Sequence, residues 1–292
     1  MELPVVVGVD GSEPSLHALG WAADEAARRG RSLRVVYASL WERYEGGALA
    51  REVGPAGGPV RAEDVVAAAA RRATARQPDL KVTTEVVPEE AEYVLVRESR
   101  AASTVVVGHR GRGGLAEAVL GSVGPTVAAH AHCPLVVVRG DVDRDDVTRR
   151  PGRGRIVVGI GEEAETAAAV RFAAEEALLR EVPLEAVRAW RRPAHGRAAD
   201  ASPAHAAGLT PEERAVRTLR AALREVPSGL EVRRGVVEGP ARHALVDASR
   251  DAALLVVGVR HRGGHHGARL GRVAHGVLHH SACPVAVVPE CA

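Results

Sequence analysis

Short apolar runs, most of them rich in valine, alternate along the chain with longer segments in which Leu and Ala recur at helical spacing. In the first half the apolar runs lie at 4–9, 33–38, 82–87, 104–108 and 135–139. The segments of helical periodicity between them are 13–29, 60–77, 89–101 and 122–131. Continuous β-branched runs of this length are typical of parallel strands buried on both faces, and the spacing between them predicts covering helices.

The second half repeats this plan. Its apolar runs lie at 155–160, 184–189, 231–237, 254–258 and 285–289. Sequence similarity supports the repeat, since "ASTVVVGHRGRGG" at 102–114 returns as "AALLVVGVRHRGG" at 252–264, and "VVVGVDGSEPS" at 5–15 corresponds to "IVVGIGEEAET" at 156–166. Such matches, in the same order along the chain, indicate a tandem of two related domains.

The division that we predict places domains at 1–140 and 155–292, joined by a charged linker at 141–154 that ends in Pro and Gly. Alternating strands and helices require right-handed crossovers. We therefore expect an α/β fold with two tandem, doubly wound, parallel five-stranded sheets. Helices would cover both faces of each sheet in a Rossmann-like arrangement, with strand order 3-2-1-4-5.

Composition narrows the classes of function. Hydrophobic residues make up 46% of the chain but aromatic residues only 2%, so the cores must be built from Val, Ala and Leu. The formal net charge of +2 and the absence of a 20-residue apolar run favour a cytoplasmic protein that binds neither membranes nor nucleic acid. Cys133 and Cys283 each precede a proline just before a strand, and we expect both to be small buried residues.

The candidate site follows from where ligands bind in such sheets, which is beyond the carboxyl ends of the strands where the strand order reverses. Two glycine-bearing turns would meet there, "GVDGS" after the first strand and "GHRGRGG" after the fourth. Gly108 and Gly111 would let the backbone approach a ligand and adopt positive φ. Gly121 and Ser122 then open a helix, whose free amides favour an anion. The spacing predicts a phosphate cradle, with Asp10 as a ligand for a ribose hydroxyl or a metal ion.

Other phosphate-binding motifs do not fit. The chain has no GxxxxGK[ST] sequence, and the glycines after the first strand do not form GxGxxG. From spacing alone, the alternative that these glycines only make a tight turn stays open.

The combination of "VVVGVDGSEPS", the glycine and serine spacing of 108–122 and the closing "HCPLVVV" resembles the universal stress protein family in its tandem two-domain form. That resemblance implies ATP as the ligand, with Mg²⁺ on its phosphates. It implies that Asp10 lies near the ribose and phosphates, that Val107 and Ala38 lie near the adenine or ribose, and that Gly108, Gly111, Gly121 and Ser122 line the triphosphate. Arg110 and Val123 are adjacent candidates. The resemblance also implies that 135–139 and 285–289 pair within the chain as a pseudo-dimer.

The second half departs from this pattern. Gly161 stands at the position of Asp10, His261 at that of Gly111 and Arg272 at that of Ser122, whereas Gly258 and Gly271 match. A side chain where the backbone must approach, together with the lost carboxylate, predicts one nucleotide per chain, in the first domain. Arg272 and His261 could instead hold a smaller anion, although a structural partner is the simpler interpretation.

We expect a stress-response regulator or sensor with unidentified protein partners, in which pairing of whole chains into a homodimer stays open. Two alternatives are an interaction scaffold that binds no nucleotide and a slow ATPase, although no base and nucleophile can be named for catalysis. His275 and His279 lie one helical turn apart, but no further metal-ligand pattern joins them, so we assign no metal site to them.

Overall fold

The computed structural model describes residues 2–38, 61–109, 121–139, 154–161, 163–192, 209–259 and 270–290. Its first half contains β1 (Val5–Gly8), α1 (Glu13–Arg28), β2 (Leu33–Ala38), α3 (Ala62–Arg76), β3 (Val82–Val87), α4 (Ala91–Glu98), β4 (Thr104–Gly108), α5 (Val123–His130) and β5 (Leu135–Val138). Its second half contains β6 (Ile156–Gly159), α7 (Glu163–Arg180), β7 (Leu184–Trp190), α8 (Pro211–Ala222), β8 (Val232–Glu238), α9 (Ala241–Ala248), a 3-10 turn (Ser249–Asp251), β9 (Leu254–Val259), α10 (Arg272–His280) and β10 (Val285–Pro289).

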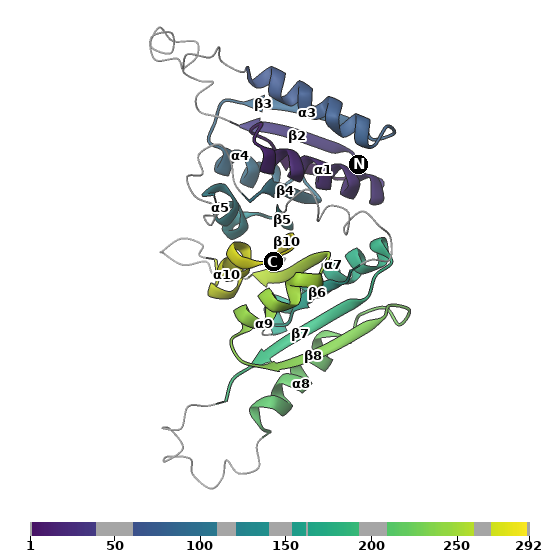
Figure 1. Ribbon diagram of the computed structural model, residues 1–292, viewed down its shortest axis with the longest axis vertical. Coiled ribbons are helices and arrows are strands. Elements are labelled where there is room, and N and C mark those ends of the chain that lie inside the picture. The colour runs from purple at the N-terminus through teal and green to yellow at the C-terminus, as the bar shows by residue number, and fades with distance from the viewer. Residues whose placement is uncertain are drawn as a thin grey trace.

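The strands form one sheet of ten in the order β3-β2-β1-β4-β5-β10-β9-β6-β7-β8. Each half therefore has the predicted order 3-2-1-4-5, and the two halves meet at β5 and β10 in the middle of the molecule (Figure 1). This pair is antiparallel, with Val285 opposite Val137 and Val287 opposite Leu135. The predicted pairing of the two last strands is thus confirmed, and it joins two five-stranded parallel sheets into one.

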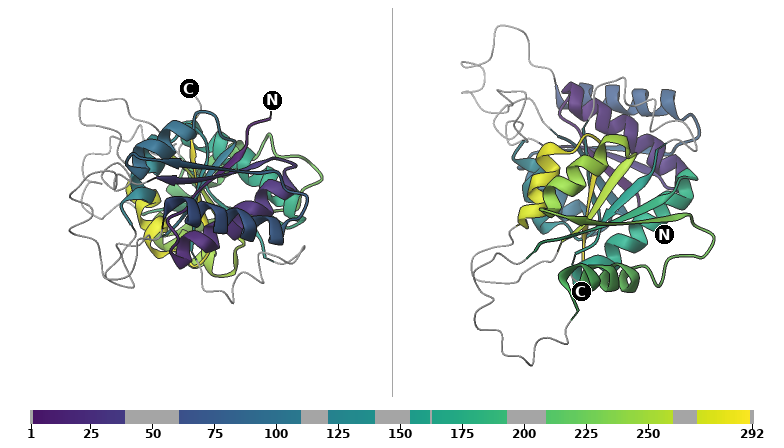
Figure 2. Two further views of the ribbon diagram at one scale, coloured as in Figure 1. Left: turned by 90° about the horizontal axis from the view of Figure 1, so that it is seen from above. Right: turned by 60° about the horizontal axis from the view of Figure 1, so that its bottom comes forward.

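Helices cover both faces of the sheet, as the two further views of the ribbon show (Figure 2). One face is buried under α1, α3, α7 and α8, and the other under α4, α5, α9 and α10. Small residues allow this close packing, because Ala18, Ala22 and Ala26 follow one stripe of α1 and are fully buried. The Val- and Ala-based core expected from composition is confirmed.

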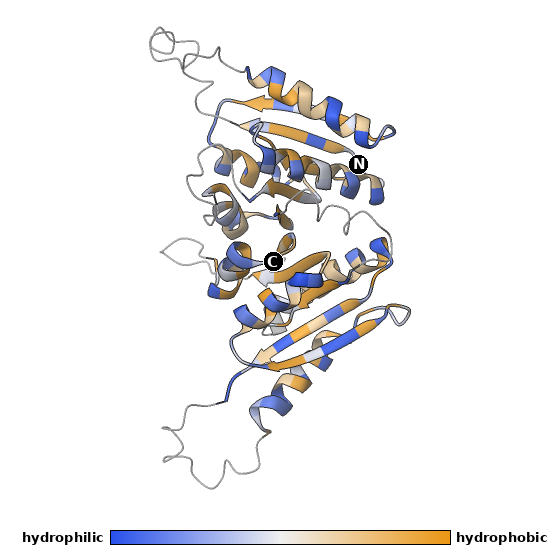
Figure 3. Cartoon of the chain, viewed as in Figure 1, coloured by the Kyte–Doolittle hydropathy of each residue, from blue (hydrophilic) through white to orange (hydrophobic). Residues whose placement is uncertain are grey.

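The two ends of the sheet are polar. β3 and β8 are the edge strands, and each carries exposed polar residues on an otherwise apolar ladder, among them Thr83 and Thr84 on β3 and Arg233 and Arg234 on β8. Figure 3 shows this change from the orange central strands to the blue segments of the outermost ones. Charged and polar side chains on an edge strand discourage pairing with another chain.

The helix ends and short turns follow local sequence rules. Thr210 caps α8 in a capping box, in which its Oγ accepts from the Glu213 N–H at 3.2 Å and a Glu213 carboxylate oxygen accepts from the Thr210 N–H at 2.7 Å.

Cys133 and Cys283 are buried as predicted, at 7% and 5% exposure. Burial raises the pKa of the Cys133 thiol to about 12, so this thiol stays protonated at neutral pH.

Candidate functional site: the cleft between β1 and β4

β1 and β4 are the central neighbours of the first half, as the crevice prediction requires. Val5 pairs with Thr104 and Val7 with Val106, while the other side of β1 pairs with β2. β1 is followed by α1 on one face of the sheet and β4 by α5 on the other. In this topology the carboxyl ends of two such neighbouring strands form the ligand crevice, and we call that region the cleft.

Asp10 follows β1 and is fixed by the turn that opens α1. Its Oδ1 accepts hydrogen bonds from the Ser12 backbone N–H at 3.0 Å and the Ser12 hydroxyl at 2.6 Å. Gly11 between them has φ of 81°, a conformation that favours glycine. The Ser15 hydroxyl, 3.3 Å from the Asp10 nitrogen, accepts the Asp10 N–H and donates to the Ser12 carbonyl at 2.8 Å. These bonds hold a half-buried carboxylate at the mouth of the cleft.

Gly108 does not have the predicted conformation. Its φ is not positive, unlike that of Gly11 and Gly30. A Cβ at Gly108 would lie 2.6 Å from the Pro14 carbonyl oxygen and 3.0 Å from the Ser15 nitrogen. The expectation of a positive φ was therefore wrong: glycine is needed here because the end of β4 packs directly against the start of α1.

Gly121 lies beside His109, the residue that follows β4. The Gly121 N–H donates to the His109 carbonyl at 3.1 Å, and the His109 N–H donates to the Val138 carbonyl at 3.0 Å. Gly108 and Gly121 are therefore close together although twelve residues separate them. Arg110 and Gly111, which the motif also includes, lie outside the described residues.

Ser122 is the N-cap of α5, but its hydroxyl binds a side chain that the sequence had not singled out. Its Oγ donates to Glu92 Oε1 at 3.0 Å, from the first turn of α4. Glu92 lies in "PEEAEY" at 88–93, and its only signal in sequence is this acidic start to a helix. With Asp10, Glu92 gives the cleft two carboxylates, so a bound polyphosphate would need a cation between its oxygens and theirs.

The apolar wall of the cleft comes from the ends of the strands. Val107 is buried, at 4% exposure, in the core under α4 and α5. Ala38 and Val123 are half-buried and pack against the same core. A planar ring could lie against this wall with its polar substituents toward Asp10 and Ser122. Of the predicted site residues, the structure thus places Asp10, Ala38, Val107, Gly108, Gly121, Ser122 and Val123 around β1, β2, β4 and α5.

The second half has a cavity at the equivalent place. Its volume is about 250 Å³, and it lies between the ends of β6, β7 and β9 and the starts of α9 and α10. The Gly161 N–H donates to Thr166 Oγ1 at 3.1 Å, which repeats the bond between Asp10 and Ser15. Gly161 itself supplies no carboxylate. Arg272 is the exposed first residue of α10, and His261 lies outside the described residues.

Two of the three histidines of α10, His275 and His279, lie against each other with tilted rings whose centroids are 4.4 Å apart. Burial, together with the neighbouring His275, His280 and Arg139, lowers the pKa of His279. Arg139 reaches this helix from the first half and donates to the Leu278 carbonyl at 2.8 Å. Within the described part of the chain, no three His, Cys, Asp or Glu side chains gather in a way that could hold a metal ion.

No helix among the described residues is both long and apolar enough to span a bilayer.

Comparison with known proteins places both halves of the chain in one family. Residues 2–139 and 152–289 each match the model of the Universal stress protein family. A universal stress protein of Mycobacterium tuberculosis strain H37Rv is 33% identical over 313 residues, covering 98% of this chain and 97% of that protein. Another from the same strain is 30% identical over 302 residues, covering 99% and 97%. The crystal structure of a universal stress protein from Archaeoglobus fulgidus shares the fold, with a TM-score of 0.68 at 17% identity over 98% of both chains.

Proposed function

Because the chain belongs to the universal stress protein family, we propose that it is a stress-response regulator that binds one adenine nucleotide, ATP with Mg²⁺, in the cleft of its first half. The observation that carries this proposal is the hydrogen bond from Gly121 to the His109 carbonyl. It brings the glycine–serine start of α5 to the end of β4, the strand that pairs with β1, which Asp10 follows. A carboxylate, a helix start and an apolar wall then surround one cleft, as a nucleoside phosphate requires.

Each part of the nucleotide has a matching part of the cleft. The base would pack on Ala38 and Val107, and the ribose hydroxyls would donate to Asp10. The phosphates would lie at the backbone amides of Gly121 and Ser122. Mg²⁺ fits the oxygen donors present, namely Asp10, Glu92 and the Ser122 hydroxyl, and when bound it would neutralise charge between the carboxylates and the phosphates.

The protein would hold the nucleotide rather than turn it over rapidly. Hydrolysis needs a positioned base for the attacking water, and one oxygen of each carboxylate, Asp10 Oδ1 and Glu92 Oε1, already accepts a hydrogen bond from a serine. The bound state would then change the contacts that the cleft rim makes with protein partners in the cytoplasm.

The test is a calorimetric titration of Mg-ATP into nucleotide-free protein and into two variants that copy the second half into the first, Asp10→Gly and Gly111→His. We expect one site per chain and a loss of affinity of roughly tenfold or more in each variant, because a charge-assisted contact or a close backbone approach is lost. Arg272→Ser, at the matching position of the second half, should leave the titration unchanged.

Three other results would contradict the proposal. A stoichiometry of two would mean that the second half also binds ATP. No binding to folded, nucleotide-free protein would favour an interaction scaffold. Phosphate release above background that disappears in Asp10→Ala would instead identify a slow ATPase.

A further inference from the structure

In the first half, an arginine fills the groove between the two helices α1 and α3. Arg76, the last residue of α3, donates to Asp24 of α1 through Nε at 2.7 Å and through Nη2 at 2.5 Å. Gln77 Nε2 donates to the same carboxylate at 2.9 Å. The guanidinium lies across Gly20, since a Cβ there would be 3.5 Å from Arg76 Cζ. The two helices are thus joined by a planar cation held on one carboxylate.

The second half has no arginine at this position. The same turn follows α3 and α8, because an N–H three residues further on donates at 3.1 Å to the carbonyl of Gln77 in the first half and of Pro227 in the second. Val226 therefore stands at the position of Arg76. A short apolar side chain replaces the long cationic one.

The facing helix keeps its carboxylate. Glu175 of α7 stands at the position of Asp24, at an offset of 151 residues. Its side chain is 62% exposed, and the cation that it meets among the described residues is Arg29, at 3.7 Å. The Asp24 side chain, under Arg76, is only 14% exposed. The second half has therefore kept the acceptor of the pair and lost its donor.

A cavity of about 450 Å³ lies between α7 and α8, at the place that the Arg76 side chain fills between α1 and α3. Pockets for small organic molecules span roughly 300–1,000 Å³, so this cavity admits a whole small molecule. Leu178 at its edge is 48% exposed. The apolar part of its lining consists of Val170, Ala174, Leu178, Ala221, Ala222 and Val226.

The charges that line the cavity balance, so their sum selects no ligand. They belong to four exposed side chains, Arg171, Glu175, Arg224 and Glu225. Arg171 stands at the position of Gly20, yet it forms no ion pair with Glu175 in the described part of the chain, so it does not replace Arg76. A Cβ at this position makes an ordinary contact with a bound guanidinium, as the 3.5 Å at Gly20 shows. Selection therefore depends on the local geometry at Glu175.

We infer that this cavity binds an organic cation, an amidinium or guanidinium on a compact apolar body, which Glu175 holds as Asp24 holds Arg76. A planar cation of this kind donates two parallel hydrogen bonds to one carboxylate. The apolar body would pack on Ala174 and Val226. The inference goes beyond the proposed function, because none of these residues belongs to the nucleotide cleft of the first half.

The experiment is a calorimetric titration of benzamidine into the full chain at neutral pH and low salt, with benzamide as the uncharged molecule of the same shape. We expect one benzamidine site per chain and an affinity for benzamide at least about fivefold lower. Glu175→Gln should weaken benzamidine binding about fivefold or more, because the charged acceptor is lost. Glu212→Gln, which changes an exposed glutamate of α8 outside the cavity, should leave it unchanged.

Exchange of the matched residues tests the comparison between the halves. Val226→Arg restores the arginine of the first half and should fill the cavity and abolish the benzamidine site. Arg76→Val should open the matched space beside Asp24 and give a second site per chain. Thermal melts without benzamidine show whether each variant is folded, and Val226→Arg carries the test if Arg76→Val is not.

Arg171→Gln tests the sign of the ligand. It removes a cation from the rim, so benzamidine should bind slightly more tightly, because like charges repel. Loss of the site in this variant would mean that the rim selects an anion and would overturn the inference.

Three further results would overturn it. They are equal affinity for benzamide and benzamidine, no heat with benzamidine up to about 10 mM, and a site that survives both Glu175→Gln and Val226→Arg. Saturating benzamidine should leave the Mg-ATP titration of the native protein unchanged, so this inference and the proposed function can fail separately.

Discussion

The two halves of the chain share the hydrogen bonds that stabilise the fold, and they differ in the side chains of the candidate site. Ser99 accepts the His132 N–H at 2.9 Å and donates to the Val96 carbonyl at 2.6 Å. At an offset of 150 residues, Ser249 accepts the Ala282 N–H at 2.9 Å and donates to the Val246 carbonyl at 2.6 Å. Asp10 and Gly161, by contrast, share a backbone bond but not a side chain. The positions that differ are thus the ones to examine for function.

The agreement is closest at the seam between the halves, where α1 and α7 contribute the same residues. Glu25 and Arg29 correspond to Glu176 and Arg180, at an offset of 151. Arg29 pairs with Glu176 and Arg180 with Glu25, so each half supplies the counter-ion of the other. The arginines also lie over aromatic rings of the opposite half, at 5.4 Å from the Phe172 centroid and 5.5 Å from that of Trp21.

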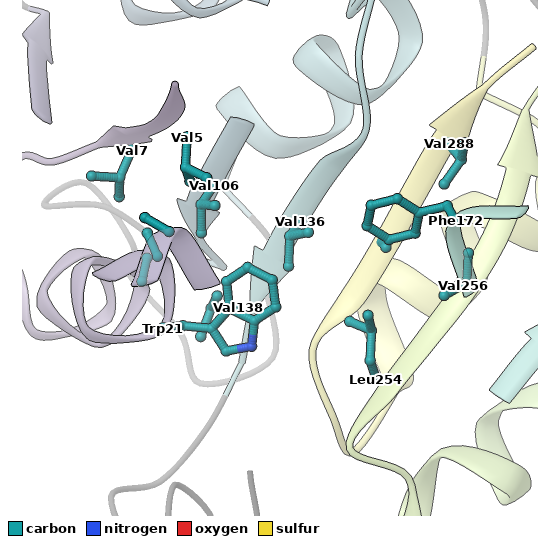
Figure 4. Close-up of a cluster of buried hydrophobic side chains, with 14 of the residues drawn as sticks. Val5, Val7, Trp21, Val106, Val136, Val138, Phe172, Leu254, Val256 and Val288 are labelled. Carbon is teal, nitrogen blue, oxygen red and sulfur yellow. The ribbon is translucent and has the colours of Figure 1, made fainter. Parts of the chain in front are cut away.

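Figure 4 shows the setting of this cluster, with Trp21 on the side of Val136 and Val138 and Phe172 on the side of Val288 and Val256. Both glutamates are almost completely buried, at 1% and 0% exposure. A buried ion pair is costly to break because the remaining charge stays out of water.

The largest effect should therefore come from Arg180→Leu. This change leaves the carboxylates of Glu25 and Glu176 without one of their two shared cations, and we expect a loss of about 3–5 kcal/mol in the free energy of unfolding. Urea unfolding at pH 7 measures it. Arg192→Leu, which breaks an exposed pair with Glu238, should cost less than about 1 kcal/mol. Similar small losses in both variants would show that the seam cluster is not essential.

The two glutamates have equivalent surroundings by symmetry and titrate as a coupled pair with two different pKa values. Burial, and then the charge of Glu25, raises the pKa of Glu176 to about 7. Burial acts against ionisation of Glu25 as well, but Arg180, the Glu176 carboxyl and Arg29 outweigh it and lower the pKa of Glu25 to about 2. The pair therefore shares one proton in acidic to neutral solution.

The two pKa shifts predict that the free energy of unfolding depends on pH. Glu176 binds its proton more tightly in the folded state than a glutamate with the usual pKa of 4.5 would. Its contribution to the free energy of unfolding is therefore full below pH 4.5 and is lost as pH rises through 7. Glu25 acts oppositely, since its contribution is full above pH 4.5 and is lost as pH falls toward 2. We expect the seam to be most stable near pH 4.5–5.

The variant Glu176→Gln should flatten the fall in unfolding free energy between pH 4.5 and 7, because the amide carries no titrating proton. Glu175→Gln is the matched control, since Glu175 is exposed and meets Arg29 only at 3.7 Å. The measurement is the free energy of unfolding of the native protein and both variants at five or six pH values. An equal slope in the native protein and in Glu176→Gln would assign the pH dependence to other groups.

Much of this fold could be predicted from sequence. Each of the ten strands overlaps a predicted apolar run, because valine runs buried on both faces leave a strong local signal. The repeat and the family resemblance together predicted the strand order and the β5–β10 pair. The candidate site at the ends of β1 and β4, with Asp10 and Gly121, follows from the same topology and stays a prediction.

What could not be predicted depends on contacts between distant residues. Glu25 and Glu176 look like ordinary helix charges in sequence, and only the packing of α1 near α7 buries them. The partner of Ser122 is thirty residues away on another helix, so nothing near Ser122 identifies Glu92. The positive φ expected at Gly108 was wrong because a glycine required by a neighbouring backbone has the same sequence signal as one that adopts a positive φ.

Gly108 also gives the last comparison, between the glycines that end β4 and β1. Gly108→Ala would place a methyl group against the Pro14 carbonyl, and backbone cannot move aside easily, so we expect a loss of about 1–3 kcal/mol in unfolding free energy. At Gly8 the nearest atom is Leu95 Cδ1 at 3.2 Å, the end of a flexible side chain, so Gly8→Ala should cost less. Urea unfolding without nucleotide measures both. If Gly108→Ala kept full stability and lost only Mg-ATP affinity, the glycine would serve the ligand and not the packing of β4 on α1.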